Sequence, residues 1–241
     1  MGDFTQVHRT SVSGEVFRQI AAQILGGDLA AGSALPPERS LTEAFGVNRQ
    51  ALREALQRLS QLGLVEIRHG GATRVTDYRA VAGLDVLPML LIRPDGTIDA
   101  RVVASMMEMR AAVGADAAAL CAERADATCV AALRQTVEEL AATHGSDAYP
   151  AVNARFWDLL TEGSGNICYR LSLNALRASY ARAEPMVMGI LAPEHSAGHL
   201  YREVVDAVAG REPERARTAA AALLECGTAA MNTFFSDWES R

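Results

Sequence analysis

Residues 35–74, which read LPPERSLTEAFGVNRQALREALQRLSQLGLVEIRHGGATR, decide the fold of the first part of the chain. A short helix is predicted over residues 37–46, and Asn48 is a good N-cap for a second helix that follows a tight turn. Residues 64–67 and 73–76 then read as two short strands around a glycine-containing tip. This order of elements predicts a helix-turn-helix followed by a two-stranded wing.

A further helix is predicted before this stretch, over residues 13–25. Val16, Ile20 and Ile24 recur there at helical spacing, so they share one face that can be buried. The module therefore has three helices and a wing, and we assign residues 1–78 to it.

Arginines stand where such a module meets DNA. Arg49 and Arg53 are four residues apart and share the exposed face at the start of the second helix of the motif. That end of a helix carries free N–H groups and the positive end of the dipole, and a guanidinium fork fits phosphates and guanine edges. Arg39 would reach the DNA backbone or a flanking base, and His69 at the wing tip would enter the minor groove.

The net charge of −6 is unusual for a DNA-binding protein, but the charge is unevenly distributed. Residues 1–78 carry eight arginines and eight acidic residues, whereas residues 79–241 carry fifteen arginines and twenty-one acidic residues. Residues 39–74 carry six arginines and three acidic residues, and the chain has no lysine. The motif must therefore supply most of the attraction to DNA by itself.

The rest of the chain is predicted to be helical. Residues 79–97 have the composition of a linker, with an amphipathic segment broken by Pro88. No alternating strand pattern follows, so residues 98–241 are predicted to form an all-α antiparallel helical bundle, and the protein as a whole is mostly α. The helices are expected near residues 99–124, 128–143, 149–162, 168–183, 194–210 and 213–235.

Composition narrows the class of protein. No apolar run is long enough to cross a bilayer and the N-terminus has no signal-peptide pattern, so we expect a cytoplasmic protein without a membrane partner. No Ser/His/Asp or Cys/His arrangement has supporting context, which favours a binding function over an enzyme. The competing class is an enzyme whose helical domain acts on a thioester or carboxylate. The scattered cysteines read as buried apolar side chains in a reducing compartment: Cys121, Cys129, Cys168 and Cys226.

The motifs of the first domain resemble one family. LPPER, then FGVNR, REAL, GLV and HG, is the pattern of the winged-helix domain of GntR-family bacterial transcription regulators, and the likeness runs over about residues 16–75. Its members bind as dimers to short palindromes, so the resemblance implies a homodimer on a palindromic double-stranded DNA operator. It also implies which positions contact DNA: Arg39, Asn48, Arg49, Gln50, Arg53, His69 and Gly70.

The second domain resembles that of the FadR-type subfamily, whose helical bundle binds a small effector. The sequence HGGATRVTDYRAVAGLDVL is especially similar to the fatty-acid-responsive branch, in which long-chain acyl-CoA releases DNA. FWDLLTEGSGN matches the segment that ends in the subfamily's recurring SGN. No cofactor is required under this interpretation, and the effector would be a long-chain acyl-CoA.

Most relatives with this bundle hold a divalent metal, but the residues here do not suit one. Asn153 and Trp157 stand where an aspartate and a histidine should be, and Tyr201 and Leu223 stand at the two later histidine positions. An amide, an indole, a phenol and an alkyl group make no tight site for zinc or a similar ion, so no metal is predicted. His195 and His199, which are four residues apart on an expected helix, are the remaining candidates for metal ligands.

Arg110 is the main polar candidate for binding the effector, because the resemblance to the subfamily implies an arginine that points into the cavity at this position. A buried guanidinium requires an anionic partner, which could be a ligand carboxylate or phosphate, or a neighbouring acidic residue. The predicted effector-binding residues are Arg110, Asn153, Trp157 and Tyr201.

These observations predict a ligand-responsive transcription regulator, most simply a repressor of fatty-acid metabolism that acyl-CoA releases from its operator. The alternative is a GntR-type regulator that responds to a small organic acid or sugar acid, assisted by a metal.

Overall fold

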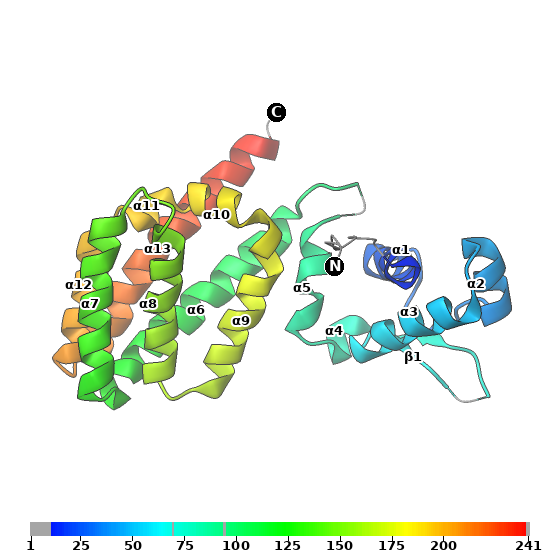
Figure 1. Cartoon of the computed structure of the whole chain (residues 1–241), viewed down its shortest axis with the longest axis horizontal. Helices are drawn as coiled ribbons and strands as arrows, with labels where there is room; N and C mark the ends of the chain where they lie inside the picture. The colour runs from blue at the N-terminus through cyan, green and yellow to red at the C-terminus, as the bar shows by residue number, and fades with distance from the viewer. Residues whose placement is uncertain (1–10, 69, 94, 240–241) are drawn as a thin grey trace, which may run out of the picture. The chain divides into compact units, whose positions relative to one another are not determined.

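The computed structural model describes residues 11–68, 70–93 and 95–239, and it divides into two compact units, residues 1–99 and 100–241. Figure 1 shows the helices of both units and the small sheet of the first unit, coloured from blue at the N-terminus to red at the C-terminus. No helix among the described residues is long and apolar enough to span a membrane.

The first unit is built on three helices. α1 (Val12–Gly26) begins at the N-cap Ser11, whose hydroxyl accepts a hydrogen bond from the N–H of Gly14. α2 (Glu38–Phe45) ends at Gly46, which adopts the left-handed conformation and allows the tight turn into α3 (Arg49–Gln61). Leu52, Leu56 and Leu59 of α3 are buried against α1, as the helical spacing predicted.

The wing is shorter than the sequence suggested. β1 (Val65–Glu66) pairs antiparallel with β2 (Arg74–Val75), and an isolated bridge joins Ala34 to Arg74. Ile67 and Thr73 lie outside the ladder because the chain turns next to them, where Gly71 donates to the carbonyl of Arg68 over 3.1 Å. At the other end, Leu64 and Thr76 lie outside the ladder but are still joined by one hydrogen bond of 3.0 Å. A mostly α fold with a helix-turn-helix and a two-stranded wing is confirmed.

The stretch predicted as a linker, residues 79–97, has more structure than expected. It contains α4 (Tyr78–Val81), a 3-10 turn η1 (Leu84–Val86) and α5 (Leu87–Leu91), followed by a bridge between Ile92 and Ile98. Pro88 does not break a helix, because it occupies the first turn of α5, where its missing N–H has no cost. Val86 is buried in the core of the first unit, with Met89 and Leu90 packed beside it.

The second unit is all helical among its described residues. The long helices α6 and α13 pack along each other, and α12 and α8 cover them. The predicted helices are found with ends shifted by one to a few residues, except in the region of residues 181–199. The bounds are α6 (Ala100–Arg124), α7 (Ala127–Thr143), α8 (Tyr149–Gly163), α9 (Ile167–Tyr180), η2 (Ala181–Ala183), α10 (Glu184–Ile190), α11 (Ala192–His195), α12 (Gly198–Ala209) and α13 (Pro213–Glu239).

The exception lies between α9 and α12. The sequence predicted one helix over residues 194–210, but the structure has α10, a separate short α11 that ends at His195, and α12 beginning at Gly198. Pro185 and Pro193 each occupy the first turn of a short helix, a position that proline tolerates.

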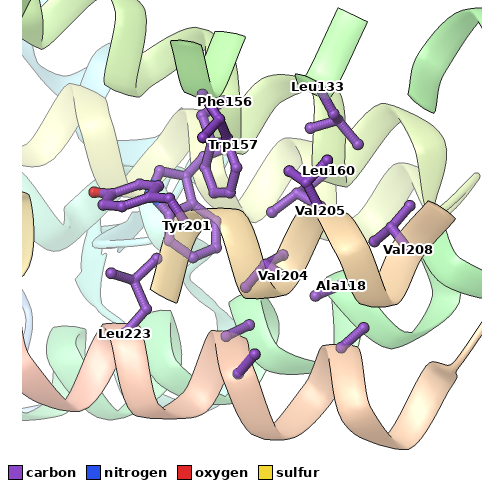
Figure 2. Close-up of a cluster of buried hydrophobic side chains, with 14 of the residues drawn as sticks. Ala118, Leu133, Phe156, Trp157, Leu160, Tyr201, Val204, Val205, Val208 and Leu223 are labelled. Atoms are coloured by element: carbon purple, nitrogen blue, oxygen red, sulfur yellow. The ribbon is translucent and has the colours of Figure 1, made fainter. Parts of the chain in front are cut away.

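The core of the second unit is a cluster of aromatic and aliphatic side chains (Figure 2). Phe156 stands between the rings of Trp157 and Tyr201, with centroid distances of 5.3 and 4.9 Å in edge-to-face geometry. Alanines on α6 and α13 allow these two helices to approach closely, which leaves the bulky residues of α8 and α12 to fill the remaining space.

Candidate DNA-reading surface and effector cavity

The start of α3 is the centre of the predicted DNA-reading surface. Asn48 caps this helix, because its side-chain Oδ1 accepts a hydrogen bond of 2.8 Å from the N–H of Ala51. Arg49 and Gln50 follow in the first turn and are exposed, and Arg49 makes no ion pair with any described residue. The first turn therefore presents a free guanidinium beside the positive end of the helix.

Two further arginines predicted to contact DNA are held in exposed ion pairs. Arg53 Nε lies 3.1 Å from Glu38 Oε2, and Arg39 Nε lies 3.0 Å from Glu43 Oε1. The two arginine side chains are 65% and 82% exposed, so each pair lies in water and contributes about 0–1 kcal/mol at most. Such pairs keep the guanidinium groups in place without preventing them from binding phosphate.

The wing tip carries the last two predicted contacts. Gly70 has a φ of 74°, a left-handed conformation that lets the chain turn sharply and leaves its backbone open to a partner. His69, the predicted minor-groove side chain, lies outside the described residues. Next to the tip, Arg68 pairs with Glu66 at 2.8 Å.

The second unit contains a cavity of about 290 Å³ between α6, α8, α9 and the segment of α10 and α11. Most of its lining is apolar, including Val113, Leu173, Leu176, Met188 and Leu224. Three of the four predicted effector residues line it: Arg110, Asn153 and Trp157. Tyr201 lies beside the lining, 1% exposed, with its hydroxyl 3.4 Å from Asn153 Nδ2.

Arg110 already has an anionic partner within the protein. Its Nη1 donates to Glu194 Oε2 over 2.8 Å and its Nη2 donates to Oε1 over 2.5 Å, so the pair is bidentate. The Glu194 side chain is fully buried, and burial acts to lower the pKa of Arg110, but the adjacent carboxylate outweighs this effect and raises it. Of the two partners left open by the sequence, the structure therefore contains the neighbouring acidic residue.

The carboxylate of Glu194 fits because α13 has a glycine opposite to it. A Cβ atom at Gly227 would collide with Glu194 Oε2 and would lie 2.9 Å from Leu191 Cδ2. The absence of a side chain at this helical position is what gives Glu194 room to reach Arg110.

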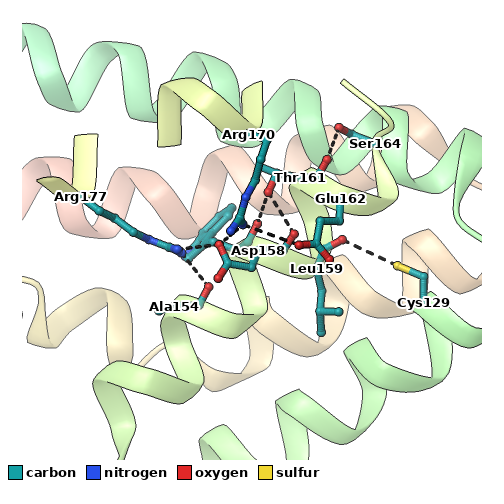
Figure 3. Close-up of polar contacts among 10 residues, drawn as sticks. Cys129, Ala154, Asp158, Leu159, Thr161, Glu162, Ser164, Arg170 and Arg177 are labelled. Atoms are coloured by element: carbon teal, nitrogen blue, oxygen red, sulfur yellow. Dashed lines mark hydrogen bonds and ion pairs between the residues drawn. The ribbon is translucent and has the colours of Figure 1, made fainter. Parts of the chain in front are cut away.

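A second arginine of the lining is also paired (Figure 3). Arg177 Nη1 donates to Asp158 Oδ1 over 2.5 Å, and its Nη2 donates to the carbonyl of Ala154 over 2.6 Å. Arg170, two turns earlier on α9, also donates to Asp158 Oδ1. These contacts connect α8 to α9 and fix one wall of the cavity.

Two polar atoms in the cavity wall have no hydrogen-bond partner among the described residues. They are Trp157 Nε1 and His195 Nε2, and both side chains are more than nine-tenths buried. Burial, and next the charges of Arg110 and His144, lowers the pKa of His195 to about 4, so its imidazole is neutral near pH 7.

The four positions compared with the metal ligands of related bundles lie near one another, because Trp157, Tyr201 and Leu223 belong to one core cluster and Asn153 Nδ2 donates to the Tyr201 hydroxyl. No group of three His, Cys, Asp or Glu side chains suited to a metal is found among the described residues. His195 and His199 were considered as a pair on one helix, but His195 is buried at the end of α11 and His199 is exposed on α12.

Sequence reasoning missed Glu194 as the partner of Arg110, and it missed His195 and Arg177 as parts of the cavity wall. The buried guanidinium of Arg110 did predict that an acidic residue or ligand must lie nearby, but many acidic residues were equally eligible. The break of the helix at residues 195–198, which determines where Glu194 points, has no clear sequence signal.

Comparisons with known proteins agree with this arrangement. Residues 12–75 match the family model described as bacterial regulatory proteins, gntR family, and residues 105–225 match the FCD domain. The chain is also 39% identical over 238 residues, 98% of each protein, to the HTH-type transcriptional regulator Mce2R of Mycobacterium tuberculosis. The chain therefore belongs to the GntR family of transcription regulators, with an FCD domain after the winged helix.

A shorter likeness is to a protein named as a regulator of fatty acid metabolism. The fatty acid metabolism regulator protein of Vibrio cholerae is 39% identical over 98 residues, which is 41% of this chain and 33% of that protein. Among solved structures, Lar of Listeria monocytogenes superposes with a TM-score of 0.55 at 17% identity, covering 96% of this chain and 99% of its own, which shows a shared fold.

Proposed function

We propose that this regulator is a repressor of fatty-acid or lipid metabolism genes, and that a long-chain acyl-CoA-like effector in the FCD domain releases it from a palindromic operator. The observation that carries the proposal is the cavity of the second unit, which is lined mainly by apolar side chains and whose two arginines are already paired. A cavity of this kind favours a hydrocarbon over a small, highly charged acid.

The size of the cavity defines which part of the effector it would hold. Its volume of about 290 Å³ lies at the lower end of the range of about 300–1,000 Å³ for ligand pockets. That space suits an acyl chain, and each buried methylene would contribute about 0.8 kcal/mol to binding. The coenzyme A group would remain outside.

The DNA-reading half of the proposal assigns contacts to Arg39, Asn48, Arg49, Gln50, Arg53, His69 and Gly70. Arg49 supports it best, because its guanidinium is exposed at the start of α3 and has no ion-pair partner among the described residues. A homodimer would place two such helices on the two half-sites of a palindrome, about one helical turn of about 34–36 Å apart.

Release would follow from a difference in affinity between two dimer geometries. If the effector binds more tightly to the geometry in which the reading helices no longer match the half-sites, it lowers operator affinity, and the bound operator lowers effector affinity by the same factor. No catalytic step is needed, and none is proposed.

The test is fluorescence anisotropy with an operator selected from random duplexes. Palmitoyl-CoA should weaken operator binding, whereas coenzyme A alone should not. A sugar acid such as glucarate, with and without Zn²⁺, is the matched comparison. If glucarate with Zn²⁺ releases the operator and palmitoyl-CoA does not, the acyl effector is wrong and the small-acid alternative replaces it.

A further inference from the structure

The helix α9 has much less apolar packing than the core helix α12. Of its 14 residues, Leu176 and Ser179 are buried. The buried residues of α12, which has 12 residues, are Tyr201, Val204, Val205, Ala207 and Val208. A helix with few buried apolar contacts opens locally at a lower free energy than the core does.

Apolar side chains on the inner face of α9 border the cavity. Leu173, Leu176 and Tyr180 belong to its lining. On the outer face, Ile167 and Leu171 are 67% and 58% exposed. The protein itself therefore packs only part of the apolar surface of α9, and an apolar ligand in the cavity would add contacts to the inner face.

Polar contacts hold α9 against its neighbours (Figure 3). Asp158 of α8 accepts hydrogen bonds from both Arg170 and Arg177, and these three side chains are 27%, 28% and 24% exposed. Tyr169 donates to Asp116 Oδ2 of α6 over 2.7 Å. Because water reaches the Asp158 cluster, it can solvate the charges when the contacts separate.

The other side of the cavity is held more firmly. α11 is anchored by the fully buried Glu194, which accepts two hydrogen bonds from Arg110, and separating that pair would leave charges away from water. α10 has no buried residue, but it contributes Glu184 and Met188 to the lining, a smaller share of the wall than that of α9. Of the larger walls, α9 is therefore the one that separates at the lowest cost.

We infer that α9 is the movable wall of the cavity, which separates from α8 to admit a ligand, and that Asp158 is the latch that holds it closed. A ligand inside would pack against Leu173 and Leu176 and would hold the wall closed. This inference rests on the proposed function only in treating the cavity as the ligand site.

Hydrogen–deuterium exchange of the full-length protein, followed by mass spectrometry, tests the movable wall without a ligand. After correction for intrinsic rates, amides of α9 should exchange about tenfold or more faster than those of α12. Asp158→Ala should speed exchange in α9 by a further factor of about three or more and leave α12 unchanged. Equal protection of α9 and α12, or fast exchange confined to α10, would overturn the inference.

Glu139→Ala is the matched control for the latch. It removes the ion pair between Glu139 of α7 and Arg155 of α8, whose side chains are 35% and 47% exposed and which does not involve α9. Exchange in α9 should stay within about twofold of the parent in this variant. If Glu139→Ala loosens α9 as much as Asp158→Ala does, the assignment of Asp158 as the latch is wrong.

Ligand kinetics provide a second readout, with the fluorescent fatty acid cis-parinaric acid as the probe in stopped-flow experiments. Asp158→Ala should raise its association and dissociation rate constants about threefold or more each, and it should change the Kd by less than about twofold, because the latch opposes both entry and exit. Unchanged rate constants in the folded variant would contradict the latch.

The outcomes also distinguish this inference from the proposed function. If palmitoyl-CoA releases the operator but α9 is as protected as α12, only the inference fails. If α9 opens as expected and palmitoyl-CoA has no effect on the operator, the inference stands and the proposed effector is wrong.

Discussion

The two units of this regulator use arginine in opposite ways. In the winged helix, Arg53 and Glu38 form a single contact of 3.1 Å in water, with the two side chains 65% and 40% exposed. In the FCD domain, Arg110 and Glu194 form a bidentate pair in which the arginine is 16% exposed and the glutamate is not exposed at all. The first guanidinium is free to change partner, and the second is committed to the fold.

This difference has a physical cause. Water screens the exposed pair, so exchanging Glu38 for a DNA phosphate costs little. Separating the buried pair would leave a charge in a medium that solvates it poorly, which costs several kcal/mol. We therefore expect arginines of the first unit to act in binding, and those of the cavity wall to act in defining which ligand is accepted.

The largest expected effect is on stability. Glu194→Ala leaves Arg110 buried without a partner and should lower the free energy of unfolding by about 3–5 kcal/mol. Glu38→Ala, the matched change in the exposed pair, should lower it by less than about 1 kcal/mol. Urea denaturation measures both, and similar losses for the two variants would remove the distinction between the pairs.

The second effect is on the pH dependence of stability. Because the pKa of His195 is lowered from 6.5 to about 4 on folding, the unfolded chain binds the proton more readily, and stability should fall as the pH drops from about 6.5 to about 4. The loss from this group should reach about 2–3 kcal/mol. His195→Gln should remove that part of the slope in denaturation curves recorded across this range, whereas the exposed His199→Gln should keep it.

The third effect is on DNA binding. Arg49→Ala and Arg53→Ala should each weaken operator binding by about 1–3 kcal/mol, the range for a base contact by a guanidinium group. Arg134→Ala, an exposed arginine on α7, is the control and should leave the operator affinity unchanged. If Arg49→Ala and Arg53→Ala bind as the parent does, α3 is not the reading helix.

The smallest effect separates capping from DNA contact at Asn48. Asn48→Ala should cost about 0.5–2 kcal/mol of stability, because the N–H of Ala51 loses its acceptor, whereas Asn48→Ser should restore the cap. Thermal unfolding measures the cap. Operator binding that stays weak in the stable Asn48→Ser protein would indicate a direct DNA contact, and full recovery would indicate that Asn48 acts through the helix alone.

The fold was largely predictable because its signals are local. Asn48 as a cap, the tight turn before α3 and the leucines of α3 act over a few residues, and the structure confirms each of them. The cavity wall was less predictable because its contacts are distant in sequence. Arg110 and Glu194 are 84 residues apart, and their meeting depends on the break between α11 and α12 and on Gly227.

The prolines show the limit of local reasoning most clearly. Pro88 was predicted to break an amphipathic segment, but it lies in the first turn of α5, and Pro185 and Pro193 likewise lie in the first turns of α10 and α11. Proline is compatible with either outcome, and packing of the flanking residues decides which one occurs.

The central claim is that an apolar ligand in the FCD cavity controls operator binding by the winged helix. The most direct measurement compares operator dissociation constants with and without palmitoyl-CoA for the parent and for Val113→Trp, in which a larger side chain fills the cavity lining on α6. The account predicts that palmitoyl-CoA raises the dissociation constant of the parent by about tenfold or more and leaves that of Val113→Trp nearly unchanged. An equal response of the two proteins would contradict it.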